Sequence, residues 1–165
     1  MDTSFYLDKF QKAADRLDKK LLGEKEVEAA VVMYGEDCVV LKLFKRLWTN
    51  QFQNPLTSES RIFFSAWISD STLEEQKILY NIHALKLRQL KGYSIQSRKF
   101  ADIFRDSFKD FEHKWENVNV KLGPQTLMEG WLKTDSENFQ DEILKLGNRF
   151  LEIEYLVDNT LARFK

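Results

Sequence analysis

The sequence predicts a single α+β domain over residues 1–165, in which a small antiparallel sheet of about three strands (residues 24–69) packs against a majority-helical body. Two observations support this fold class. The first part of the chain holds three β-rich runs separated by turn residues, and the remainder shows apolar side chains at helical spacing. With 43% apolar residues, a chain of this length can bury a core without a disulfide or a metal.

Residues 2–22 are expected to form the first helix, which ends at Gly23. Candidate N-terminal caps are Asp2, Thr3 and Ser4. The apolar stripe at 3.6-residue spacing consists of Tyr6, Phe10, Ala13, Ala14, Leu17 and Leu21. We expect this stripe to face the core, because its side chains share one side of the helix.

Two β-rich runs follow, at residues 27–34 and 38–48, and the turn residues 35–37 separate them. This arrangement predicts a β-hairpin. The first run is also compatible with a longer first helix, because residues 26–30 are glutamates, alanines and a single valine.

The third run, residues 61–69, is apolar on both faces and predicts a third strand. Strands of this kind lie between two layers or carry an exposed aromatic groove. The polar residues 49–59, which contain a proline, predict a loop before this strand.

The rest of the chain is predicted to be mainly helical. A capping-box pattern, Ser-Thr-Leu-Glu, opens a helix over residues 71–91, and a second helix is expected over 97–116. One narrow face of the second helix carries Phe100, Phe104, Phe108, Phe111 and Trp115. Residues 117–123 are compatible with a short strand and 124–132 with a short helix. Ser136 is expected to cap a long C-terminal helix.

Composition and motifs narrow the classes of function. A formal net charge of −1 argues against attraction of the whole surface to nucleic acid or to an anionic membrane. The single Cys38 cannot form an internal disulfide, and the N-terminal residues lack the pattern of a secretory leader. We therefore expect a cytoplasmic protein without a membrane partner. No phosphate-binding glycine loop, zinc motif, EF-hand or serine-hydrolase motif occurs, so we expect neither a metal nor a cofactor.

One segment has a one-sided charge. Residues 76–101 contain six basic residues and no acidic one. The six are Lys77, Lys86, Arg88, Lys91, Arg98 and Lys99. With aromatic residues interleaved, such a surface can bind phosphate or an anionic partner, although nucleic acid is not the favoured one. The alternative is a solvated face that pairs with acids of the C-terminal helix.

Two polar residues fall among the apolar side chains of the expected 71–91 helix. His83 and Lys86 lie one turn apart on it. A desolvated lysine has a lowered pKa and can act as a base or nucleophile, and a neighbouring imidazole can share its proton. The functional interpretation is a small pocket that includes both residues. The structural alternative is a lysine that extends to solvent and a core histidine bonded to the backbone.

The C-terminal helix shows the apolar spacing of a coiled-coil seam. Its seam residues are Phe139, Ile143, Leu146, Phe150, Ile153, Val157 and Phe164. This seam can pack inside the domain or against a second copy. It therefore suggests a homodimer formed through the C-terminal helix.

Two classes of function follow from these features. The favoured class is a non-catalytic binding or interaction protein that uses the basic surface of residues 77–99 or an aromatic face of the sheet. The alternative is an enzyme or small-ligand-binding protein whose pocket includes His83 and Lys86. The sequence assigns no catalytic residue to either class.

Overall fold

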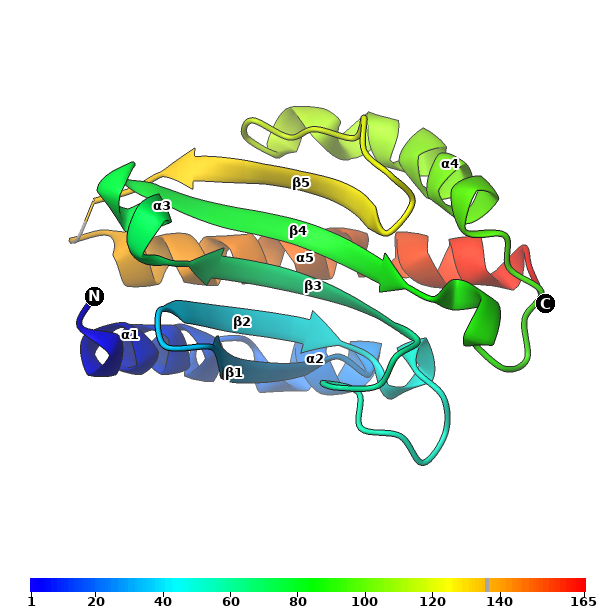
Figure 1. Ribbon diagram of the computed structural model, residues 1–165, viewed down its shortest axis with the longest axis horizontal. Coiled ribbons are helices and arrows are strands. Elements are labelled where there is room, and N and C mark those ends of the chain that lie inside the picture. The colour runs from blue at the N-terminus through cyan, green and yellow to red at the C-terminus, as the bar shows by residue number, and fades with distance from the viewer. Residues whose placement is uncertain (136) are drawn as a thin grey trace.

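The computed structural model describes residues 1–135 and 137–165, and it has an α+β fold with 45% helix and 25% strand. Its described strands form one antiparallel sheet in the order β1-β2-β3-β4-β5 (Figure 1). The strands are β1 (Glu28–Tyr34), β2 (Cys38–Phe44), β3 (Arg61–Ile68), β4 (Lys77–Leu85) and β5 (Thr126–Lys133). Each strand thus pairs with its neighbour in the sequence.

The helices cover only one face of this sheet. The described α-helices are α1 (Thr3–Asp15), α2 (Lys19–Lys25), α3 (Asp70–Glu74), α4 (Ser97–Phe108) and α5 (Phe139–Ala162). Short 3₁₀ turns are η1 (Arg46–Trp48), η2 (Leu87–Gln89) and η3 (Lys109–Lys114). Figure 1 shows α1 and α5 behind the sheet and α4 beside β5, with no helix across the face toward the viewer. We call this uncovered face the open face.

The predicted hairpin and third strand are confirmed. β1 and β2 pair from Glu28↔Phe44 to Tyr34↔Cys38, with Gly35 at φ +61° in the connecting turn. A positive φ suits glycine, so the turn forms without strain. β3 carries buried residues on one face and pocket-lining aromatics on the other, which agrees with the aromatic-groove alternative.

The prediction of about three strands within residues 24–69 is wrong, because the sheet has five strands and extends to Lys133. The expected 71–91 helix is mainly strand β4, and only the five-residue α3 is helical there. Ile78 and Ile82 are four residues apart, a spacing that fits both a helix face and one face of a strand. Residues 77–85 form a strand because β3 pairs with them on one side and β5 on the other.

The short helix expected over residues 124–132 is also wrong, because β5 occupies this stretch. Residues 117–123 contribute only an isolated bridge, Asn119↔Glu129, rather than a strand. The helical body is consequently smaller than expected and makes up less than half of the chain. The misassigned stretches, β4 and β5, complete the sheet by long-range pairing that local patterns do not reveal.

The other helix predictions differ mainly in their boundaries. The first helix is split, because Asp18 caps a separate α2 with its side chain. This helix continues through Gly23 to Lys25, and Glu26 ends it in the left-handed conformation at φ 58°. The expected 97–116 helix comprises α4 and the 3₁₀ turn η3. Ser136, the expected cap of the last helix, lies outside the described residues.

The core is a layer of aromatic and aliphatic side chains between the sheet and the helices. Phe64 of β3 and Phe150 of α5 stack with ring centroids 4.8 Å apart. Phe104 and Phe108 are fully buried and stack at 5.7 Å, as the aromatic stripe predicted. The seam of α5 is buried against its own sheet. The observation that suggested a homodimer through the C-terminal helix is thus explained by packing within one chain.

A buried ion cluster holds the end of β2 to α5. Lys45 Nζ lies 2.7 Å from Glu154 Oε2 and 2.5 Å from Asp158 Oδ2. Trp48 Nε1 donates to Asp158 Oδ1 at 2.7 Å, and Lys25 joins Glu154 at 3.0 Å. Burial alone would lower the pKa of Lys45, but the two carboxylates outweigh it and raise the pKa. The lysine therefore stays charged inside the fold.

Among the described residues, no helix combines the length and the apolar character needed to cross a membrane.

Phe150→Ala is expected to lower the free energy of unfolding by about 3–5 kcal/mol, because it leaves a cavity beneath β3. Phe52→Ala is the control, since the Phe52 side chain is 98% exposed and its loss should change stability by less than about 0.5 kcal/mol. Urea unfolding followed by circular dichroism measures both variants. A loss below about 1 kcal/mol for Phe150→Ala would contradict the core position of this ring.

Candidate functional site

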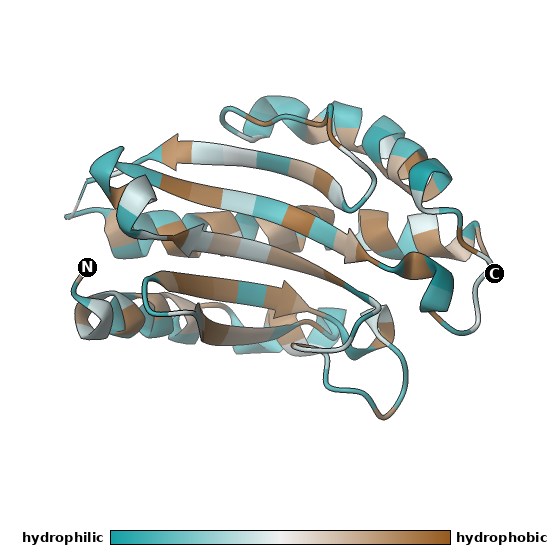
Figure 2. Cartoon of the chain, in the orientation of Figure 1, coloured by the Kyte–Doolittle hydropathy of each residue, from teal (hydrophilic) through white to brown (hydrophobic). Residues whose placement is uncertain are grey.

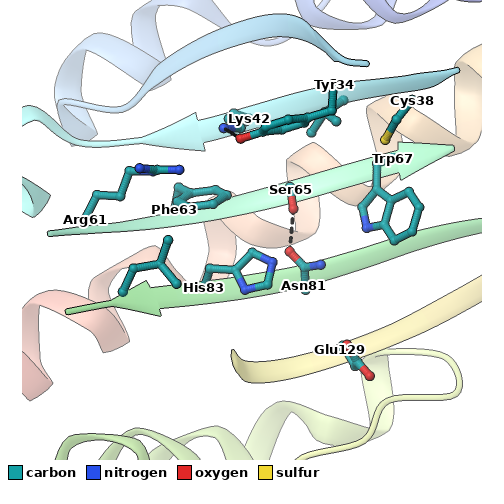
Figure 3. Close-up of a pocket in the computed structure, with 12 residues that line it drawn as sticks. Tyr34, Cys38, Lys42, Arg61, Phe63, Ser65, Trp67, Asn81, His83 and Glu129 are labelled. Carbon is teal, nitrogen blue, oxygen red and sulfur yellow. Dashed lines mark hydrogen bonds between the residues drawn. The ribbon is translucent and has the colours of Figure 1, made fainter. Parts of the chain in front are cut away.

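The open face contains a pocket of about 460 Å³ that is built from all five strands (Figure 3). Its walls are Tyr34, Cys38, Val40, Lys42, Arg61, Phe63, Ser65, Trp67, Asn81, His83, Leu85 and Glu129. These residues alternate along their strands with core residues such as Leu41, Phe64 and Ile82. The two-residue period of a strand therefore places the pocket on the opposite side of the sheet from the helices.

Lys42 is the most unusual side chain of the pocket. It is only 2% exposed, although it lies on the open face. Its Nζ donates to Tyr34 Oη at 2.5 Å and lies 4.6 Å from the ring centroids of both Tyr34 and Phe63. Within residues 1–135 and 137–165, no carboxylate forms an ion pair with it. A buried ammonium group without a counter-charge is energetically costly, and the two rings offset only part of this cost.

The other two basic side chains of the pocket, Arg61 and His83, lie beside the ring of Phe63. The guanidinium of Arg61 lies 5.1 Å from the Phe63 ring centroid, and the His83 ring centroid lies 5.2 Å from it. Arg61 donates through Nη1 to the carbonyl of Ser58, while its buried Nε has no hydrogen-bond partner in the described part of the chain. An unpartnered buried donor can be satisfied by a ligand atom.

Burial and the charges of Lys42 and Arg61 shift the pKa values of two pocket residues, His83 and Tyr34. Burial is the largest cause that lowers the pKa of His83, and the charges of Lys42 and Arg61 lower it further, while the Gln125 backbone partly offsets them. Burial by itself would raise the pKa of Tyr34. The hydrogen bond from Lys42 and the charges of Lys42 and Arg61 outweigh burial, so the pKa of Tyr34 is lowered. The lowered pKa of Tyr34 shows that Lys42 and Arg61 favour a negative charge at this end of the pocket.

The remaining polar groups of the pocket lie on its other side. Ser65 donates to Asn81 Oδ1, which leaves the amide nitrogen of Asn81 as a donor toward the pocket (Figure 3). Glu129 on β5 is the carboxylate among the lining residues, and it lies at the opposite rim from Lys42. Across the strands, Lys42 pairs with Ser65, Ser65 with Asn81, and Asn81 with Glu129. The pocket is thus cationic at one end and acidic at the other.

Cys38 and His83 are the thiol and the imidazole that line the pocket. Burial, followed by the charge of Asp37, raises the pKa of the Cys38 thiol, so this cysteine is a poor nucleophile. His83 Nδ1 lies 3.3 Å from Thr126 Oγ1, beside β5. Among the described residues, no group of three His, Cys, Asp or Glu side chains is arranged to hold a metal ion.

The six residues of the predicted basic segment do not form one surface. Lys77 begins β4, pairs with Glu75 at 3.2 Å and lies 4.2 Å from the Trp131 ring centroid. Lys86 is beyond the other end of the same strand and pairs with Glu59 at 3.4 Å. The four that remain are exposed and follow β4 through η2 into α4: Arg88, Lys91, Arg98 and Lys99.

The acidic C-terminal helix does not neutralise these four residues. Its Asp141 pairs with Arg16 at 3.1 Å, and its Glu154 and Asp158 hold Lys45. In the described part of the chain, none of the four takes part in an ion pair. The expected pairing of the basic segment with the C-terminal helix is therefore not observed.

Of the two residues predicted to share a pocket, His83 and Lys86, the structure places only His83 in this one. His83 lines the pocket, whereas Lys86 has the left-handed conformation after β4 and is exposed. The lysine of the pocket is Lys42, which was not predicted because helical spacing along residues 71–91 does not relate it to His83, whereas the pairing of β2, β3 and β4 does. The signal for Lys42 in the sequence is a single cation within an otherwise apolar strand, Cys-Val-Val-Leu-Lys-Leu-Phe.

Tyr34 is expected to ionise at a lower pH than a free tyrosine, because Lys42 and Arg61 stabilise its phenolate. Tyr80 is expected to ionise at a higher pH than a free tyrosine, since burial and the charge of Glu116 raise its pKa. In an alkaline titration of tyrosinate absorbance, Tyr34→Phe should remove an early step, below the pKa of a free tyrosine, and Tyr80→Phe a late step above it. An unchanged early step in Tyr34→Phe would show that its hydroxyl is not held by the lysine.

Because no protein-family model matches the chain, and no curated protein or solved structure is significantly similar to it, the chemistry of the pocket rests on its own side chains.

Proposed function

We propose that the protein binds a small amphipathic anion in the pocket of the open face. The observation that carries this proposal is the ammonium group of Lys42, which is buried without a carboxylate partner. The proposal combines the expected non-catalytic binding role on an aromatic sheet face with the expected small-ligand pocket around His83. A cytoplasmic location belongs to the same proposal.

The energetics favour a ligand that supplies the missing negative charge. Removing an ammonium group from water costs several kcal/mol, and this cost is repaid only by a well-placed opposite charge. Three residues later, just beyond the end of β2, Lys45 has two carboxylates from its own chain. Among the described residues, Lys42 has only the Tyr34 hydroxyl and the rings of Tyr34 and Phe63. A carboxylate, phosphate or sulfonate on a ligand would complete its coordination, and the free Nε of Arg61 offers a second donor.

The apolar walls of the pocket indicate the chemistry of the ligand's body, the part without the acidic group. Phe63, Trp67, Val40 and Leu85 line it, so the body of the ligand should be apolar or aromatic. A volume of about 460 Å³ lies within the range of small-molecule sites. The ligand class is therefore a compact apolar or aromatic molecule with one acidic group.

The depth of the pocket argues against a nucleic acid on this face. Sheets that bind single strands offer exposed aromatic rings, on which successive bases stack. Here Phe63 is 5% exposed and Lys42 is 2% exposed, so both lie at the floor of the pocket. A polynucleotide backbone would be held too far away to contact them.

A second candidate function concerns the surface formed by Arg88, Lys91, Arg98 and Lys99. These four side chains are exposed, and no ion pair holds any of them within the described residues. They support a proposal that this surface binds a polyanion or an acidic protein partner. It is independent of the pocket, because none of the four lines it.

The pocket is tested with the fluorescent probe 1-anilinonaphthalene-8-sulfonate, which joins an aromatic body to a sulfonate. Lys42→Met should weaken binding at least about tenfold, because a charge-assisted hydrogen bond contributes about 1.5–3 kcal/mol. Lys86→Met is the matched control, since it removes the exposed lysine beside Glu59 and should leave the affinity unchanged. Fluorescence titration of the folded variants gives the affinity and stoichiometry.

The stability of Lys42→Met separates a binding role from a structural one. Replacing an unpaired buried charge with an apolar side chain of similar length should leave the melting temperature unchanged or raise it. Equal probe affinity in Lys42→Met and the parent protein would refute the proposed pocket. A sharp loss of stability would instead assign Lys42 to the fold.

The basic surface is tested with duplex DNA as a generic polyanion. Contacts at three to four phosphates predict a log–log salt dependence of roughly −2.7 to −3.6. The double variant Arg88→Glu/Lys91→Glu should abolish this binding and leave the melting temperature almost unchanged, since exposed charges contribute little to stability. Unaltered binding by the double variant would exclude this surface as the polyanion site.

A further inference from the structure

The two edges of the sheet differ in how their backbone groups are satisfied. The outer side of β5 is covered by hydrogen bonds from the segment that precedes it. They are Arg105 Nε to Leu127 O at 3.0 Å, Arg105 Nη2 to Thr126 O at 2.9 Å, Asn119 N to Glu129 O at 2.7 Å, Glu129 N to Asn119 O at 3.0 Å and Asn117 Nδ2 to Trp131 O at 3.1 Å. This edge is closed to any further strand.

The opposite edge, β1, has no such cover. Its residues Glu28–Tyr34 pair with β2 along the whole strand without a register shift. In the described part of the chain, its backbone receives no hydrogen bond from any other segment. Natural sheets protect such edges with lysine, proline, bulges or short strands. The sequence Glu-Ala-Ala-Val-Val-Met-Tyr contains neither lysine nor proline, and it is apolar over five successive residues.

We infer that β1 is the interface of a homodimer, in which β1 of one copy pairs antiparallel with β1 of a second copy. The two sheets then form one continuous sheet across a two-fold axis. Each copy provides the same strand, so the contact closes after two subunits instead of propagating. The covered edge of β5 prevents further growth of the sheet.

The strand is complementary to itself when the two-fold axis passes through Val31. Ala29 then faces Met33 of the second copy, and Ala30 faces its Val32, so a small side chain meets a larger one on both faces. Glu28 faces Tyr34, and thus no charge lies opposite a like charge. This register also pairs all seven residues of the strand.

Charge explains why the second strand is a copy of β1 rather than a charged segment of another protein. The charged residue of β1, Glu28, already pairs with Arg46 at 2.8 Å. The strand therefore offers no free charge for recognition and selects an uncharged, apolar strand. Seven paired residues alone bury less surface than the roughly 1,200–2,000 Å² of a stable interface. Association in the micromolar range is consequently expected.

The register is tested by disulfide trapping in the full chain with Cys38→Ser, which removes the natural thiol. In Val31→Cys, the two cysteines would lie opposite each other with Cα atoms about 4.5–5.5 Å apart, within disulfide range. In Ala29→Cys, the matched control, they would be separated by four residues, or about 13 Å. Val31→Cys should form a covalent dimer under mild oxidation much faster than Ala29→Cys.

The assembly is tested by sedimentation at micromolar concentrations. The parent protein should be dimeric, and Val32→Lys should be monomeric with an unchanged circular dichroism spectrum, because a lysine blocks edge pairing. Phe52→Lys, which alters the exposed ring of the 49–59 loop, should stay dimeric. A monomeric parent protein, or equal crosslinking of the two cysteine variants, would overturn the proposed interface.

Discussion

The packing of α5 across one face of the sheet is the contact on which the rest of the structure depends. This helix has 24 residues, and its apolar seam runs behind the strands, with Phe150 stacked on Phe64. Close to its C-terminal end, Glu154 and Asp158 bind Lys45 and thereby tie the helix to the end of β2. Because α1 and α4 both pack against α5, one helix organises the layer that covers the sheet. Figure 2 shows apolar (brown) residues along the ribbons of both the sheet and α5.

One-sided coverage explains why the pocket lies where it does. A strand sends alternate side chains to opposite faces, so the burial of Leu41 and Leu43 against the helices directs Lys42 to the open face. No helix covers Lys42 there; the Tyr34 side chain reaches back from the end of β1 and bonds to it. Lys42 and Lys45 therefore form a natural comparison. Lys45 is neutralised by α5, whereas Lys42, on the open face, has no carboxylate partner among the described residues.

The acids of α5 that form ion pairs contact basic residues from one part of the chain. Asp141, Glu154 and Asp158 of α5 are used by Arg16, Lys25 and Lys45, all from the N-terminal part of the chain. They are unavailable to the cations that follow β4. The near-zero net charge of the chain thus conceals an uneven distribution. Among the described residues, the ion pairs of α5 include neither Lys42 nor the four exposed cations that follow β4.

Local patterns in the sequence determined four features: the hairpin of β1 and β2, the strand β3, the aromatic stripe of α4 and the apolar seam of α5. Each of these patterns is contained within one short segment of the chain, so it can be recognised without knowledge of the tertiary structure. Only the tertiary structure decided that β4 is a strand, since Ile78 and Ile82 fit either period until β3 and β5 provide hydrogen-bond partners. The pocket likewise forms only through this long-range pairing of strands. His83 could be singled out as a polar residue in an apolar segment, but Lys42 and Phe63 join it only because three separate strands lie side by side. Sheet register connects residues far apart in the chain, and a single sequence holds no local record of that register.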